Sequence, residues 1–253
     1  ERARIHQYLD QQHVELIHGA ASFLDAHTLR ISGPAGERTL RAGTILVATG
    51  SSPFHPPEFA FPDDRICDSD QILHLARMPK TMAVVGAGVI GSEYACTFAA
   101  LGVKVHVIDG RDSLLPVLDA EVSSTLARAM SELGIVFHWK ENVTACDAPK
   151  GPGDVTVRLS SGATLAADTV LVAAGRTSNT ETLGLDAAGV TLGKRGLIPV
   201  DAQYRTNVPG IYAVGDVIGA PALAATGVEQ ARVAMSHAFD LGFKSEVSPI
   251  LPY

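Results

Sequence analysis

The sequence predicts an α/β fold of the Rossmann type, with a parallel sheet extended by an antiparallel β-meander. Three observations indicate this class. The segment GAGVIG at 86–91 places three glycines between an apolar run and the start of a helix. Strand-like and helix-like segments alternate from 81 to 139, which is typical of βαβ units. The segment 155–173 alternates apolar and polar residues before it ends in an apolar strand, which predicts the meander.

The elements before the glycines are short. Residues 44–50 form an apolar run that ends in glycine and predicts a buried strand. The connection after it, 51–62, is rich in proline, so we expect it to be irregular. A short helix should follow, with Ser69 as its N-cap and Pro79 ending it.

The predicted dinucleotide-binding unit has its strands at 81–85, at 103–109 and at 135–139. The glycines lead from the first strand into a helix that stops at Gly102. Asp119 is expected to cap a second helix, in which apolar residues recur at helical spacing. These apolar residues are Val122, Leu126, Ala129, Met130 and Leu133.

Composition and charge bear on the partners of the chain. Of its 253 residues, 46% are hydrophobic, and the net charge is −7 without a cluster of basic residues. We therefore expect neither nucleic acid nor a membrane as a partner. The sequence shows no signal peptide and no transmembrane run, which predicts a cytoplasmic protein. Because the chain does not begin with Met, we expect it to be a piece of a longer protein.

The cysteines and histidines predict no metal site. Cys67, Cys96 and Cys146 stand far apart, without the spacing of a zinc site or a local dithiol, and we interpret them as small buried residues. The nine histidines show no metal-ligand spacing either. His138, next to Trp139, is interpreted as a packing residue.

Each glycine of the turn has its own role in a dinucleotide site. Gly86 permits the sharp turn from strand to helix, Gly88 lets the main chain approach a pyrophosphate, and Gly91 lets the helix pack closely on the strand. The phosphates would lie against the N–H groups around Val89 and Ile90 at the start of the helix. The alternative is a glycine turn that serves only the fold. The strand before it, the helix after it and the acidic end of the next strand favour a dinucleotide.

The end of that next strand bears on which dinucleotide binds. Asp109 can accept hydrogen bonds from both hydroxyls of an adenosine ribose and would repel a 2′-phosphate, which favours NAD over NADP. Arg111 acts in the opposite direction, because a guanidinium can pair with a phosphate or stack on adenine. A solvated loop arginine fits the sequence equally well. We predict NAD binding with NADP tolerated.

A second group of residues lies at the ends of two other strands. Thr49 and Gly50 close the strand at 44–50, and Gly215 and Asp216 follow the apolar segment IYAV. Ligands of open α/β sheets gather at the carboxyl ends of the strands. The helix predicted after Asp216 could direct its first amides to the same place. Taken alone, Asp216 fits a cap or a turn residue better than a ligand contact.

Four segments, ILVATGSSP, GAGVIGSEYA, AAGRTSNT and TNVPGIYAVGDVIG, in this order and spacing, resemble the flavoprotein disulfide reductases, the family of two-dinucleotide-binding flavoproteins. The resemblance spans essentially the whole chain. Within the family, the segments RICDSDQIL, GVIGSEYA and GRTSNTETLGL are most similar to the soluble transhydrogenases.

The resemblance implies an NAD(P)-binding domain at 69–190, inserted between two parts of an FAD-binding domain at 1–68 and 191–253. It also implies that the N-terminal βαβ unit for the FAD pyrophosphate and the C-terminal dimerisation domain are missing. The full-length protein would bind FAD and form a homo-oligomer. Because the first pyrophosphate turn is missing, we expect this chain alone to hold flavin poorly or not at all.

The resemblance also assigns roles to individual residues. Glu93 matches a family glutamate near the flavin and the nicotinamide, and Gly175 and Arg176 match a strand-end turn beside the nicotinamide half. The sequence alone also allows Glu93 as a solvated helix carboxylate and Arg176 as a surface residue. Asp216 would lie near a ribityl hydroxyl. The residues that would contact FAD are Thr49, Gly50, Gly215 and Asp216.

The reaction implied is hydride transfer between NADPH and NAD through FAD, in which the protein acts mainly by positioning. The fragment alone would be inactive. A lipoamide dehydrogenase would share these motifs and would differ by a dithiol in the N-terminal part. A dehydrogenase that uses nicotinamide alone would not need the two strand ends on either side of the Rossmann unit. A non-catalytic nucleotide-binding module would bind coenzyme without turnover.

Overall fold

The computed structural model describes residues 2–61 and 63–248. The chain forms two compact units. The flanking unit consists of Glu1–Ser52 and Thr177–Tyr253, and the central unit of Pro53–Arg176. The chain passes between them through β5 (Ser51–Pro53) and β14 (Arg176–Ser178), which pair with each other.

The units divide earlier in the chain than the boundaries expected after residues 68 and 190. At the first boundary, β6 (Ile66–Cys67) pairs in parallel with β13 (Thr169–Val172), which places residues 53–68 in the central unit. At the second boundary, Leu185 is buried in the core of the flanking unit. The packing of apolar side chains therefore sets the boundary between the two units. The proline-rich segment that marked the connection in the sequence does not set it.

The central unit is built on a five-stranded parallel sheet with the order β6-β13-β7-β8-β9. The chain crosses over through two helices, α2 (Val89–Ala100) and α3 (Ala120–Glu132). The predicted α/β class, with its alternation of strands and helices, is confirmed. The three remaining strands of the sheet are β7 (Thr81–Val85), β8 (Lys104–Asp109) and β9 (Val136–Trp139).

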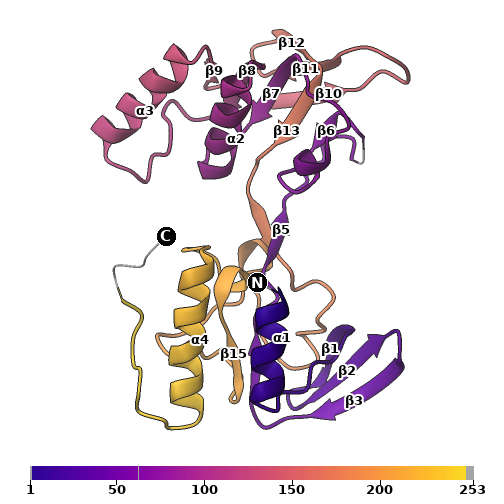
Figure 1. The fold of residues 1–253 in the computed structure, drawn as a ribbon, viewed down its shortest axis with the longest axis vertical. Coiled ribbons are helices and arrows are strands. Elements are labelled where there is room, and N and C mark those ends of the chain that lie inside the picture. Colours follow the sequence, from indigo (N-terminus) through magenta and orange to yellow (C-terminus); the bar gives the residue numbers. More distant parts are fainter. Residues whose placement is uncertain (1, 62, 249–253) are drawn as a thin grey trace. The chain divides into compact units, whose positions relative to one another are not determined.

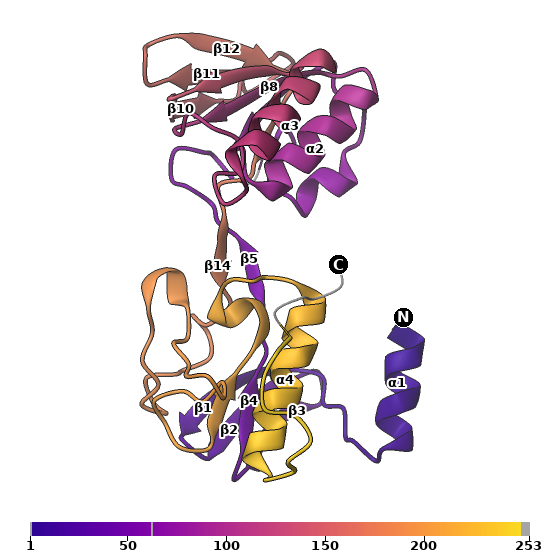
Figure 2. The ribbon, with the colours of Figure 1, turned by 90° about the vertical axis from the view of Figure 1, so that its left-hand side faces the viewer.

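Each face of the parallel sheet is covered by a different layer (Figure 2). The helices α2 and α3 cover the face on which Val105 is buried. An antiparallel meander covers the face on which Ile108 is buried. A sheet buried on both faces explains why β7 and β13 are almost continuous apolar runs in the sequence. The strands of the meander are β10 (Val143–Asp147), β11 (Val155–Leu159) and β12 (Thr164–Ala167).

Side-chain caps explain where two of the helical segments begin. Asp119 caps α3 as predicted, since its Oδ1 accepts a hydrogen bond from the N–H of Glu121 at 2.8 Å. The prediction for Ser69 was wrong. The expected helix is a single 3₁₀ turn, η1 (Gln71–His74), and the carboxylate of Asp68 accepts the N–H bonds at its start.

The flanking unit contains a parallel pair, β4 (Ile45–Val47) with β15 (Ile211–Ala213), and the predicted C-terminal helix, α4 (Ala224–Ala238). Its other elements escape the sequence analysis. The three strands among them are mostly exposed, so they lack a strong apolar signal. These elements are α1 (Arg2–Gln11), the antiparallel strands β1 (Ala20–Asp25), β2 (Thr28–Gly33) and β3 (Gly36–Arg41), and the 3₁₀ segments η2 (Lys194–Gly196) and η3 (Gly215–Ile218) (Figure 1).

Among the described residues, none of the helices combines the length and the apolarity needed to cross a membrane. Nor does that part of the chain place three or more His, Cys, Asp or Glu side chains so that they could hold a metal ion.

Cys67 and Cys146 are buried. Burial raises the pKa of the Cys67 thiol to about 11 and that of Cys146 to about 12, so both stay protonated and unreactive at neutral pH.

A histidine pair joins two neighbouring strands of the parallel sheet. Nδ1 of His106 on β8 lies 3.0 Å from Nε2 of His138 on β9. Burial lowers the pKa of both imidazoles. The nearby His138 and Lys104 lower the pKa of His106 further, while Glu141 acts in the opposite direction on His138. His138 therefore does more than pack, because it is hydrogen-bonded to a residue far away in the sequence.

We expect this pair to make the central unit less stable in mild acid. In the unfolded chain both imidazoles bind a proton near pH 6.5, whereas in the folded chain their pKa values are lower. The free energy of unfolding therefore has its full value above pH 6.5. It decreases as the pH falls through 6.5 towards the folded-state pKa values, because the unfolded chain then binds protons more readily than the folded chain. The urea midpoint, followed by the fluorescence of the single tryptophan, Trp139, should be lower at about pH 5.5 than at about pH 7.5. His138→Gln should reduce this difference, and the exposed His27→Gln should not.

Candidate functional site

The glycine-rich turn joins β7 to α2 at the carboxyl edge of the parallel sheet. Gly86 has a φ of +105°, and a Cβ there would lie 2.4 Å from the carbonyl oxygen of Ala173. A Cβ on Gly91 would lie 1.9 Å from the carbonyl oxygen of Gly86. The geometry of these two glycines agrees with the turning and packing roles expected for them.

Gly88 is in a different position, because it faces open space. Its backbone is extended, with φ −79° and ψ −176°, and a Cβ there would meet no atom within 4 Å. In the described part of the chain no side chain caps α2, which begins at Val89. The first N–H groups of the helix, including those of Val89 and Ile90, have no acceptor within the helix. Open space before an uncapped helix N-terminus fits a diphosphate.

Asp109 lies beside this turn, at the end of β8, and is nearly buried. Its Oδ2 accepts a hydrogen bond from the N–H of Ala87 at 2.7 Å, so it braces the turn directly. The N–H and Nε of Arg111 donate to Oδ1 at 2.9 and 2.8 Å, and Nη2 donates to Oδ2 at 2.6 Å. Burial pushes the pKa of Asp109 upward, but the hydrogen bonds from Arg111 and Ala87 outweigh this effect and hold the pKa below its ordinary value.

The contacts of Asp109 add a condition to its expected role. A carboxylate has about four acceptor positions, and the four donors from Ala87 and Arg111 occupy them. Asp109 could therefore accept the two ribose hydroxyls only after Arg111 had turned away. The side chain of Arg111 is 45% exposed, so solvent is open to its guanidinium.

A pocket of about 420 Å³ is lined by residues of α2, of the segment around η1 and of the start of β14. It brings together three residues that the sequence analysis assigned to the coenzyme site, Ile90, Glu93 and Arg176. Gly175, just before Arg176, has a φ of +107°, and its carbonyl oxygen accepts a hydrogen bond from the N–H of Phe54 at 2.9 Å. The other residues that line the pocket are Ser69, Asp70, Leu73, Tyr94 and Thr97.

In the flanking unit, the residues expected to contact FAD lie at the carboxyl ends of β4 and β15. Gly50 and Gly215 both have positive φ, +72° and +74°, and a Cβ on either would meet nothing within 4 Å. The hydroxyl of Ser51 donates to Oδ2 of Asp216 at 2.9 Å. Asn179 contacts the β4 end, since the Thr49 hydroxyl donates to its carbonyl oxygen at 2.9 Å.

The start of α4 adjoins this second site. A Cβ on Gly227 would lie 3.4 Å from Cα of Gly215, and the N–H of Gly215 donates to Oε1 of Gln230 at 2.7 Å. The hydroxyl of Thr226, in the first turn of the helix, is buried and has no hydrogen-bond partner among the described residues. Two open glycines and a buried hydroxyl that lacks a partner fit part of a flavin cofactor.

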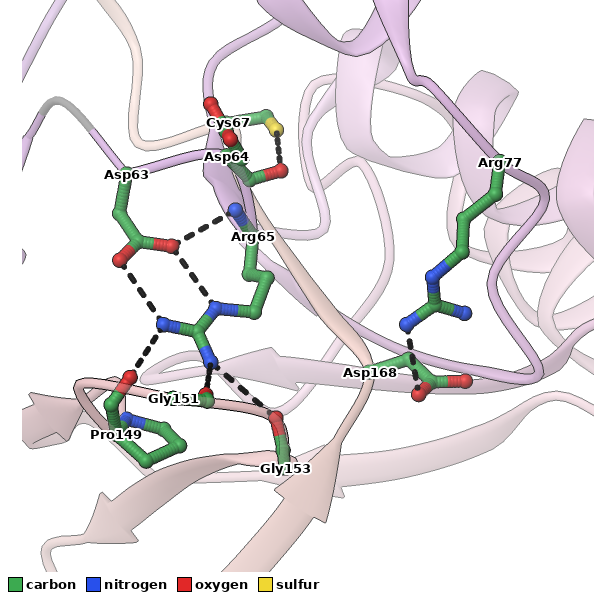
Figure 3. A network of polar contacts seen from close by, with 9 residues as sticks. All are labelled: Asp63, Asp64, Arg65, Cys67, Arg77, Pro149, Gly151, Gly153 and Asp168. Carbon is green, nitrogen blue, oxygen red and sulfur yellow. Dashed lines mark hydrogen bonds and ion pairs between the residues drawn. The ribbon is translucent and has the colours of Figure 1, made fainter.

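A larger cavity of about 880 Å³ lies elsewhere in the central unit, beside the start of β13, and two ion pairs lie in its lining (Figure 3). Arg65 binds Asp63 at 3.1 Å and also donates to the carbonyl oxygens of the loop at 149–153. Arg77 lies 3.4 Å from Asp168. None of the residues expected to bind a dinucleotide is among those that line this cavity, so its size does not make it the coenzyme site.

Sequence reasoning missed several residues of the two sites. Ala87 is a neutral residue within the glycine motif, and only its backbone N–H acts. Asn179 and Gln230 hold the ends of β4 and β15 from positions distant in the chain. Tyr94 was visible in the segment GSEYA, but its partner, the carbonyl oxygen of Ser69, could not be found without the fold.

The comparison with protein families decides the affiliation of the chain. Residues 1–238 match the pyridine nucleotide-disulphide oxidoreductase family. The chain belongs to that family. Other proteins that this family member matches carry names such as soluble pyridine nucleotide transhydrogenase and flavoprotein disulfide reductase.

The relatives that the chain matches include proteins named soluble pyridine nucleotide transhydrogenase. The one from Mycobacterium bovis BCG Pasteur is 45% identical over 237 residues, which cover 93% of this chain and 50% of the relative. The one from Colwellia psychrerythraea is 42% identical over 246 residues, which cover 97% of this chain and 52% of the relative. This chain thus spans about half the length of the curated relatives it matches.

The solved structures that share the fold include LpdA and RclA. LpdA from Mycobacterium tuberculosis has a TM-score of 0.88 at 33% identity, with 98% of this chain and 54% of that chain covered. The flavoprotein disulfide reductase RclA from Escherichia coli, solved as a Cu(II) complex, has a TM-score of 0.88 at 27% identity, with 97% and 55% covered. The Rossmann-type architecture of this family member is thereby confirmed.

Proposed function

We propose that this chain is the coenzyme-binding part of an FAD-dependent transhydrogenase, which transfers hydride between NADPH and NAD. The observation that carries the proposal is the contact between Asp109 and Arg111 beside the glycine turn. A transhydrogenase has to accept both coenzymes at one site. A carboxylate and a guanidinium that hold each other can serve one coenzyme each, once the pair has opened.

In this proposal the chain's own residues position the coenzyme. The N–H groups at the start of α2 hold the diphosphate, and Gly88 leaves room for it. With NAD(H), Arg111 turns outward and Asp109 binds the ribose hydroxyls. With NADP(H), the 2′-phosphate pairs with Arg111, which again leaves Asp109. Ile90, Glu93 and Arg176 surround the other half of the coenzyme in the 420 Å³ pocket.

FAD, when bound, supplies the hydride acceptor and donor chemistry. In the flanking unit, Thr49, Gly50, Gly215 and Asp216 would hold part of it, together with the start of α4. We also propose that flavin binding needs protein segments other than these residues, so that this chain alone transfers no hydride. The protein that contains this chain is proposed to be a cytoplasmic homo-oligomer. A lipoamide dehydrogenase-like enzyme is the first alternative function, and a non-catalytic nucleotide-binding module is the second.

The experiment that tests the proposal is Arg111→Ala, measured by calorimetry with NADH and NADPH. We expect NADPH to bind about tenfold more weakly, which is the scale of a lost charge-assisted hydrogen bond. NADH should bind as in the wild type or more tightly, because the two acceptor positions of Asp109 that the guanidinium filled are then open.

Lys140→Ala is the matched control, since it removes an exposed cation whose nitrogen lies 3.6 Å from the Asp112 carboxylate. It should leave both affinities unchanged. An equal loss for both coenzymes in Arg111→Ala would contradict the assignment. In the full-length protein, a flavin absorbance band with NADPH-to-NAD turnover and no lipoamide activity separates the proposal from both alternatives.

A further inference from the structure

The chain carries a buried acid at the carboxyl edge of the parallel sheet that the coenzyme contacts described above do not use. Asp68 is only 5% exposed and follows β6, the strand next to β13. Its Oδ1 accepts the N–H groups of Asp70 and Gln71, each at 2.8 Å. Its Oδ2 accepts a hydrogen bond from Nε2 of His55 at 2.8 Å. Burying a carboxylate is costly unless its acceptor positions are filled. The hydrogen bond from His55 is therefore one of three that keep the Asp68 carboxylate in place.

The turn that Asp68 organises forms one wall of the 420 Å³ pocket. Ser69, Asp70 and Leu73 line the pocket from this turn. Tyr94 on α2 also lines the pocket, and its hydroxyl donates to the carbonyl oxygen of Ser69 at 2.9 Å. The turn is therefore held by hydrogen bonds to both Asp68 and Tyr94. A shift of Asp68 would move the wall.

The order of the strands indicates which half of a coenzyme lies in this pocket. The glycine turn follows β7, and Asp109 follows β8, which lies on one side of β7. The strands β13 and β6, with Arg176 and Asp68 near their ends, lie on the other side. A coenzyme with its diphosphate at Gly88 and its adenosine at Asp109 must place its nicotinamide half towards β13 and β6.

The position of His55 is itself well determined. Its ring stacks on Phe61, with centroids 4.0 Å apart and an interplanar angle of 12°. The preceding residue, Phe54, is hydrogen-bonded through its N–H to the carbonyl oxygen of Gly175 at 2.9 Å, beside the end of β13. The imidazole is 44% exposed, so it is not buried to fill the core. The polar contact of its ring is the hydrogen bond from Nε2 to Asp68.

We propose that His55 and Asp68 are positioning residues for the nicotinamide half of the coenzyme, a role that rests on the proposed function. His55 holds Oδ2 of Asp68, Asp68 holds the turn, and the turn sets the wall against which the nicotinamide nucleotide lies. The pair touches neither the diphosphate turn nor Asp109. Its loss should therefore weaken the binding of the nicotinamide half alone.

The test compares two probes, NADH and ADP-ribose, which keeps the adenosine and diphosphate but lacks nicotinamide. In calorimetry with this chain, His55→Leu should raise the Kd of NADH about five- to tenfold, the scale of one lost hydrogen bond. The Kd of ADP-ribose should stay within about twofold of the wild type. His55→Gln keeps an N–H donor of similar reach and should restore most of the NADH affinity.

His74→Leu is the matched control, because it makes the same change on η1 at a residue that lines the other cavity. It should leave both affinities unchanged. Urea unfolding followed by Trp139 verifies that each variant is folded. If His55→Leu weakens both probes equally, or neither, the inference is overturned. If the folded wild-type chain binds neither probe, the proposed function itself has failed.

Discussion

Gly88→Ala is expected to weaken NADH binding about 30- to 100-fold while the chain stays folded, which corresponds to the loss of one or two charge-assisted hydrogen bonds. The added methyl would point into the open space before α2, where we place the diphosphate. It would hold the phosphate oxygens away from the N–H groups of the helix. Alanine adopts an extended backbone like that of Gly88 without strain, so the free energy of unfolding should change by less than about 1 kcal/mol.

Calorimetry with NADH and urea unfolding followed by Trp139 measure the two quantities separately. Gly43→Ala is the matched control, because a Cβ there also meets nothing within 4 Å but lies in the flanking unit. It should change neither quantity. If Gly88→Ala binds NADH as the wild type does, the diphosphate does not lie on this turn.

Gly86→Ala is expected to act on stability instead, with a loss in the central unit of about 2–4 kcal/mol. Two costs add at this residue. A φ of +105° is unfavourable for any residue with a Cβ. The Cβ would also lie 2.4 Å from the backbone oxygen of Ala173, which cannot move without disturbing the end of β13. The glycine turn would open, and coenzyme binding would fall with it.

Urea unfolding followed by Trp139 gives the loss directly. Gly102→Ala separates its two causes, since Gly102 also has a positive φ, +87°, but a Cβ there would meet nothing within 4 Å. It should cost about 1 kcal/mol, from the backbone alone. Equal losses for the two variants would show that the contact with Ala173 contributes nothing.

Local patterns in the amino-acid sequence were sufficient for the framework of the central unit. The glycine turn, the alternation of strands with helices, and the cap at Asp119 depend on residues within one or two turns of each other. Their rules are those of backbone sterics and short-range hydrogen bonds, which a sequence displays directly. Ser69 shows the limit, because the residue directly before it, Asp68 at the end of β6, accepts the N–H bonds of Asp70 and Gln71 instead.

The exposed elements of the flanking unit could not be predicted in the same way. Strands β1 to β3 bury few side chains, so they lack the apolar alternation that identifies a strand. The unit boundaries also escaped, because β6 joins the sheet through a partner about a hundred residues further along the chain. Only the packing of apolar side chains decides to which unit such a short strand belongs.

For the coenzyme site, the amino-acid sequence supplied the residue types, and the fold supplied their pairing. Gly86, Gly88, Asp109 and Arg111 stood out from the motif and its spacing. That Arg111 turns back to fill the carboxylate of Asp109, and that His55 reaches Asp68, depended on the path that the chain takes around each strand end. Contacts of this kind form because burial penalises every polar group without a partner, and the chain meets that penalty only when it has folded.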